Sequence, residues 1–148
     1  MGDYFALQPR IIQRLKQANI PGLGGVLPAR DLRLLAEGRV EDAVVYVLFD
    51  GESVPAGEEY RAGPWQTVHQ QWLVVLATKN YAAPALGDKD RAGPILWEIN
   101  RVLQGWSPGP GMSALVKVTS PRASYTEKTT LYALRYAGTI QTEGGHTP

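Results

Sequence analysis

Cysteine is absent from this 148-residue chain, and histidine occurs only twice. The absence of cysteine excludes disulfide bonds, thiolate nucleophiles and every metal site that needs a cysteine ligand. It suits a chain that folds in a reducing cytosol, although cysteine-free proteins occur in every compartment. Disulfide-stapled scaffolds and cysteine-dependent enzymes are therefore excluded first.

Long hydrophobic runs are missing as well. The best apolar run covers residues 72–77, which is the length of a strand and far below the roughly 18 residues that a membrane-spanning helix needs. Residues 1–5 show no basic segment leading into an apolar one, so we predict no secretory signal. We expect no membrane association and a chain that is made in the cytoplasm.

Neither sign of charge is in clear excess. Fifteen Lys and Arg stand against fourteen Asp and Glu, a net charge of +1, whereas duplex-binding proteins typically carry a basic patch or a strongly basic domain. The 44% hydrophobic and 20% charged residues are typical of a globular protein. We predict one domain over residues 1–141, followed by a flexible, polar tail over residues 142–148.

Two segments have helical periodicity. Residues 9–18 place apolar side chains on one side, with Pro9 in the first turn, where its missing N–H costs nothing. A second stripe follows Pro94, which we expect to open a helix that ends at Gly105. Between them, residues 22–41 predict a short strand and then one or two helical turns.

The remaining periodic segments predict strands. Residues 43–49 form a continuous β-branched and aromatic run, typical of a strand buried on both faces. Residues 67–78 change from polar to apolar, and a strand of about 12 residues spans roughly 40 Å at ~3.3 Å per residue. We therefore expect its polar half to project beyond the core toward a neighbouring subunit.

Two further strands are predicted at residues 115–118 and 131–140, with loops at residues 50–64 and 81–93. Gly/Pro-rich loops between consecutive strands favour antiparallel pairing. The predicted fold class is α+β: a mixed, mainly antiparallel sheet of about four to five strands packed with two main helices.

No set of residues forms a catalytic pattern. His69 lies on the polar half of a strand, where an interface or edge position is a simpler explanation than a catalytic base, and His146 lies in the polar tail. The glycines after Pro21 lack the Lys and Ser/Thr of a phosphate-binding loop. We predict no enzyme activity, no cofactor and no metal site.

Tryptophans next to Gly/Pro loops are the more informative residues. Trp65 and Trp106 are candidates for partner contacts because Trp is favoured at the centres of interfaces, and packing within the chain is an equal alternative for each. Trp97 lies near the stripe of the second helix, which favours a core position.

Three stretches resemble the phage tail-terminator family of Mu-like and related tailed phages. The first is the early apolar strand, residues 42–48. The second is the polar-to-apolar strand that runs from Gln70 to Asn80. The third is Leu103-Gln104-Gly105-Trp106-Ser107-Pro108, which fits an L-x-G-W-x-P signature after the second helix. With the β-rich C-terminus, the resemblance covers about residues 9–140.

The resemblance implies a structural virion protein that forms a ring, usually a hexamer. Such a ring caps the tail tube, halts tube polymerisation and presents its other face for head-tail joining. Implied partners are the tail tube protein and the head-tail connector proteins, and phage DNA passes through the lumen without specific binding. The implied location is the tail-neck junction of the virion, reached from the host cytoplasm.

The candidate interface combines the polar strand half with the two loop-flanking segments. It comprises Trp65, His69, Gln70, Gln71, Trp72, Trp106 and Pro108. Two alternatives remain: a head-completion or connector adaptor of the phage neck, and a small-ligand-binding α+β domain. The latter would need a closed pocket with convergent polar groups, and the sequence contains no such cluster.

Overall fold

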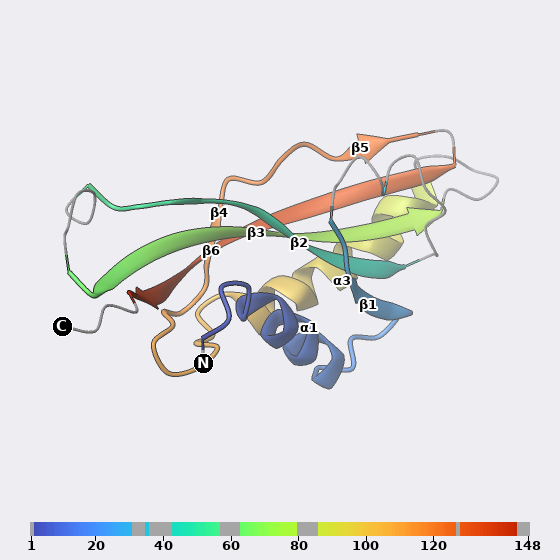
Figure 1. Cartoon of the computed structure of the whole chain (residues 1–148). Helices are drawn as coiled ribbons and strands as arrows, with labels where there is room; N and C mark the ends of the chain where they lie inside the picture. The colour runs from blue at the N-terminus through green and yellow to red at the C-terminus, as the bar shows by residue number, and fades with distance from the viewer. Residues whose placement is uncertain are drawn as a thin grey trace.

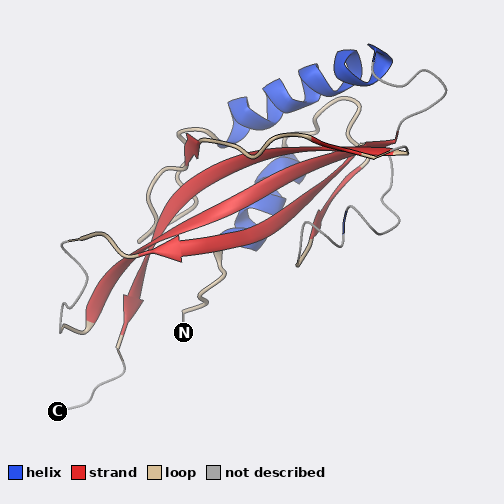
Figure 2. Ribbon diagram, turned by 90° about the horizontal axis from the view of Figure 1, so that it is seen from above, coloured by secondary structure: helices blue, strands red, loops and turns tan. Residues whose placement is uncertain are grey.

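A computed structural model describes residues 2–30, 35, 43–56, 63–79, 86–126 and 128–144, except for the side chains of residues 86–90. In this part of the chain, two helices lie against one mixed sheet (Figure 1, Figure 2). The helices are α1 (Leu7–Gln17) and α3 (Leu86–Leu103). The strands are β1 (Gly25–Pro28), β2 (Val44–Ser53), β3 (Trp65–Lys79), β4 (Val116–Val118), β5 (Ser124–Tyr125) and β6 (Thr129–Glu143).

The sheet has the order β1-β2-β3-β6-β4, and β5 also pairs with β6. Only the β1–β2 pair is parallel. The predicted α+β class with a mainly antiparallel sheet is confirmed, with six strands instead of four or five. The additional strand, β5, has two residues and a polar composition, so no periodic pattern marks it in the sequence.

Strand β2 is buried on both faces, as its apolar run predicted. Val45 and Val47 point toward the helices, where they join a core that includes Ile11 and Ile99. On the opposite face, Tyr46 belongs to a second buried cluster. The second cluster also contains Leu35, Val44, Leu48, Leu73, Val75, Ala77, Leu131 and Ala133.

Strand β3 is longer than predicted, with 15 residues that span roughly 50 Å at ~3.3 Å per residue. It pairs with β6 along its whole length, whereas its pairing with β2 stops at His69. The end of the β3–β6 ribbon extends beyond the helices (Figure 1). The predicted projection is therefore confirmed for the outermost residues, whereas Val68 and Gln70 remain buried. We call residues 65–71 of β3 and 137–143 of β6 the arm.

Strand β6 includes Thr142 and Glu143, which the sequence assigned to a flexible tail. Their pairing with Gln66 and Trp65 makes them part of the arm. The hydrogen bond from the Gly144 N–H to the Pro64 carbonyl, 2.6 Å, closes the end of the ribbon. Residues 145–148 of the predicted tail lie outside the described part of the chain.

Helix α3 begins at Leu86, so the loop predicted for residues 81–93 is wrong from residue 86 onward. Pro94 lies inside the helix and does not open it. A residue before proline normally avoids helical geometry because its Cβ meets the proline ring, and Gly93 has no Cβ. The Gly93-Pro94 pair therefore lets the helix continue, at the cost of one backbone hydrogen bond.

The end of α3 is as predicted, because Gly105 adopts a left-handed conformation with φ 80° just after the helix. Trp97, however, is 74% exposed, so its predicted core position is wrong. It lies two residues after the buried Ile95, which places it on the opposite side of a helix with 3.6 residues per turn.

Residues 22–41, which predict a short strand and then helical turns, are described in part. Strand β1 confirms the short strand, shifted to residues 25–28. Leu35 is helical and buried, and the rest of the predicted helical turns lie outside the described residues.

Candidate association surface

The arm presents two chemically different faces because side chains alternate along a strand. Val68, Gln70 and Trp72 are buried on the face that the helices cover. Trp65, Thr67, His69 and Gln71 occupy the other face and are exposed or half-buried. Strand β6 places further residues beside them in register, namely Ala137 opposite Gln71, Thr139 opposite His69, Gln141 opposite Thr67 and Glu143 opposite Trp65.

We call this second face of the arm the outer arm face. Its side chains are mainly neutral and polar, and Trp65 at one end is 52% exposed. A flat strip of polar side chains with an exposed Trp suits a contact with another protein, because it supplies hydrogen-bonding groups together with a large apolar anchor. Three of the predicted interface residues, Trp65, His69 and Gln71, come together here.

Gln70 and Trp72 do not belong to this surface, which corrects their predicted place at an interface. Both are fully buried. The Trp72 indole N–H donates to Gln70 Oε1 at 3.3 Å, and Gln70 Nε2 donates to the Tyr4 carbonyl at 2.8 Å. The buried amide thus satisfies two polar groups in the core, and these side chains support the arm from within.

The N-terminal segment braces the base of the arm. Phe5 packs edge-on against Phe49 and Trp72, with ring centroids 5.0 and 6.4 Å apart. The Tyr4 hydroxyl donates to a carboxylate oxygen of Glu52. This hydrogen bond, together with burial and the charge of Glu52, raises the pKa of Tyr4 to about 12. These contacts hold the N-terminal segment against the part of the sheet from which the arm extends.

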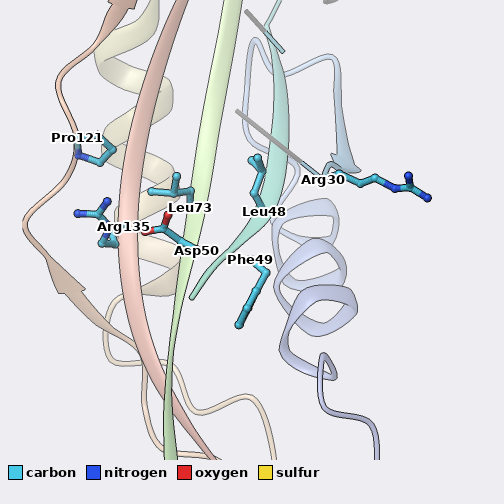
Figure 3. A pocket seen from close by; sticks show the side chains of 7 residues that line it. All are labelled: Arg30, Leu48, Phe49, Asp50, Leu73, Pro121 and Arg135. Carbon is cyan, nitrogen blue, oxygen red and sulfur yellow. Dashed lines mark hydrogen bonds and ion pairs between the residues drawn. The ribbon is translucent and has the colours of Figure 1, made fainter. Parts of the chain in front are cut away.

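A cavity of about 270 Å³ lies beside the second buried cluster, next to an ion pair (Figure 3). Arg135 Nε donates to Asp50 Oδ2 at 2.7 Å, and Arg135 Nη1 donates to the Thr119 carbonyl at 2.9 Å. Figure 3 shows Arg30 pointing away from this pair. Among the described residues that line the cavity, the three charged groups do not converge on a common point.

Trp106 and Pro108 lie on the helix layer, apart from the outer arm face. Pro108 is buried and Trp106 is half-buried, and both line a surface shared with α1. The Arg14 guanidinium lies 5.3 Å from the Trp106 ring centroid. A groove of about 430 Å³ runs between α1 and this segment, and we call it the α1 groove.

Among the described residues, no group of three or more His, Cys, Asp or Glu side chains is placed to hold a metal ion. No helix in the described part of the chain combines the length and the apolar character needed to cross a membrane.

The fold and its surfaces define an α+β subunit with a long projecting ribbon, one face of which is suited to protein contacts. The sequence model described as "Phage tail terminator protein" matches residues 1–145. The chain therefore belongs to the phage tail terminator family and is a phage tail structural protein, located in the virion.

A solved structure shares the fold. It is a chain described as "Virion of native gene transfer agent (GTA) particle", with 18% sequence identity and a TM-score of 0.61. The match covers 96% of this chain and 100% of that chain. No curated protein matches the sequence.

Proposed function

We propose that this protein forms a closed ring that caps the phage tail tube, stops tube polymerisation and offers a surface for head-tail joining. The observation that carries the proposal is the arm, a ribbon with one polar, uncovered face on a chain of the tail terminator family. The proposed partners are further copies of the chain, most simply six, the tail tube protein and the head-tail connector proteins. Phage DNA passes through the lumen.

The sheet edges support ring formation. Within the described residues, β1 pairs only with β2, and β4 pairs only with β6. Each edge carries an exposed apolar side chain, Leu27 (45%) on β1 and Val116 (56%) on β4. Unpaired edges with apolar side chains favour association with another chain.

The strand directions suit a head-to-tail contact. The sheet pairings make β4 antiparallel to β1, so the β4 edge of one copy has the direction needed to extend the sheet of the next copy at β1. Repetition of one such contact closes a ring when the rotation between copies divides a full turn. The ring then has two different faces, so only one of them resembles a tube layer.

The outer arm face is the proposed contact to the adjoining tail layer or subunit. Gln71 is half-buried on this face, and an arginine there adds bulk and a charge to a neutral strip. The matched control is Gln104→Arg, because Gln104 is exposed just after α3, on the helix layer and therefore on the opposite side of the sheet from the outer arm face. We expect the Gln71→Arg variant to stay folded and to fail in assembly.

The test is a phage that lacks this gene, complemented with each variant and imaged by electron microscopy. Without the gene, we expect overlong tails without heads, and wild-type protein or Gln104→Arg should restore tails of normal length. Gln71→Arg should not restore them. Tails of normal length in the absence of the gene would reject the termination function.

A further inference from the structure

The outward side of α1 is uniformly basic. The helix Leu7–Gln17 contains Arg10, Arg14 and Lys16 and no acidic residue. All three cations are exposed. Among the described side chains, no carboxylate forms an ion pair with Arg10 or Arg14, which interact with backbone carbonyls and one aromatic ring instead. This part of the chain therefore carries local positive charge although the net charge is only +1.

The two arginines line the α1 groove and are held in place by the end of α3 and by the segment that follows it. Arg10 Nη1 donates to the Pro108 carbonyl at 2.7 Å, and Arg14 Nε donates to the Val102 carbonyl at 3.2 Å. A guanidinium group has five N–H donors, so each of these bonds uses a single one. Because both side chains are already oriented, binding a carboxylate would cost little further side-chain entropy.

The other groove residues suit an extended peptide. Trp106 supplies an apolar ring beside the arginines, and Gln13 and Gln17 supply amide groups along the helix. A volume of about 430 Å³ holds a few side chains. A DNA duplex would instead call for a longer run of basic side chains along its phosphates than the two arginines of this groove supply.

We infer that the α1 groove binds an acidic, extended segment of a neighbouring virion protein. Its carboxylates pair with Arg10 and Arg14, and an apolar portion packs on Trp106. Arg–carboxylate pairs are charge-assisted and directional, so they fix the register of the bound segment. The groove is separate from the outer arm face and the sheet edges, so this site does not rest on ring formation.

The test measures the binding of a fluorescent octaglutamate peptide to the full-length protein by anisotropy, at about 50 mM salt to limit screening. Octaglutamine is the control peptide. We expect the wild-type protein to bind octaglutamate and not octaglutamine. Arg10→Gln and Arg14→Gln should each weaken binding by at least about fivefold, because each removes a charge-assisted contact.

The matched control is Lys16→Gln, which removes the same charge from the same helix outside the groove and should change binding by less than about twofold. Arg14→Lys serves as a second variant that keeps the charge but loses the fork geometry, and it should bind with intermediate affinity. Circular dichroism melting establishes that each variant is folded.

Three results would overturn the inference. The first is that wild-type protein does not bind octaglutamate. The second is that Lys16→Gln weakens binding as much as Arg14→Gln, which would indicate unspecific attraction. The third is that a short DNA duplex binds more tightly than the peptide and competes for the same arginines, which would assign the groove to nucleic acid.

Discussion

At the scale of single residues, neighbouring glutamines in β3 have opposite roles. Gln70 is fully buried and joins the Trp72 indole to the Tyr4 carbonyl, whereas Gln71 lies on the outer arm face. We expect Gln70→Leu to lower the free energy of unfolding by about 1–3 kcal/mol, because it leaves the buried Trp72 indole N–H without a partner and removes a partly buried hydrogen bond to the Tyr4 carbonyl. Gln71→Leu should change it by no more than about 0.5 kcal/mol. Urea unfolding of both variants measures the difference, and equal effects would contradict the assigned role of Gln70.

Tyr136 makes stability depend on alkaline pH. Its hydroxyl donates to Asn100 Oδ1 at 2.9 Å, and burial raises its pKa above the ordinary value. The folded state therefore favours the neutral phenol. This contribution is fully present below the unfolded pKa of about 10 and is lost as the pH rises from there toward the folded pKa.

The matching variant is Tyr136→Phe, which removes the titrating group and one hydrogen bond. Near pH 8 we expect the wild type to be more stable by about 1 kcal/mol. The difference should shrink as the pH rises above about 10, because only the wild-type unfolded state ionises at this position. Urea unfolding at several pH values measures it, and a difference that does not vary with pH would show that Tyr136 titrates normally.

At the scale of elements, the β3–β6 ribbon divides into a rigid body and an arm of lower stability. Leu73–Ala77 of β3 lies between β2 and β6 and is buried, whereas Trp65–Thr67 pairs with β6 alone within the described chain. In hydrogen exchange by mass spectrometry, we expect amides in the body to exchange at least about tenfold more slowly than amides in the arm. Uniform protection along β3 in the isolated protein would contradict this division.

The elements also show what the sequence could and could not predict. The projecting strand was predictable because its composition changes from polar to apolar, and alternation then places His69 and Gln71 on one face. The start of α3 at Leu86 was not predictable. A proline commonly marks the first turn of a helix, but Gly93 allows helical geometry before Pro94 here. The surroundings of Trp106 depend on Arg10 and Arg14, which are distant in sequence, so no local pattern reveals them.

At the scale of the whole molecule, substitutions at the sheet edges should affect assembly of the proposed ring most. Lysine on an edge strand opposes pairing with another strand because its charge must stay in water. We expect Val116→Lys to give a folded protein that does not form rings. Trp97→Lys also replaces an exposed apolar side chain, on α3, and should leave ring formation unchanged.

Light scattering and negative-stain imaging of wild type and both variants, each at several concentrations, measure this effect. If Val116→Lys assembles like the wild type, then the β4 edge is not a ring contact. Loss of assembly in both variants would point to general surface hydrophobicity instead of the edge.

Strand β6 lies between β3 and β4, and it is the last strand in the chain order. Every pair in its ladder with β3 joins residues before 80 to residues after 128, so the ribosome makes one half of the arm well before the other. A nascent chain therefore carries β3 without its main partner, and pairings between such distant segments form slowly. Neither the arm nor the β4 edge exists until β6 emerges. The proposed contacts through the arm and through the β4 edge therefore become available only late in synthesis, whereas the residues of the β1 edge and of the α1 groove are made earlier.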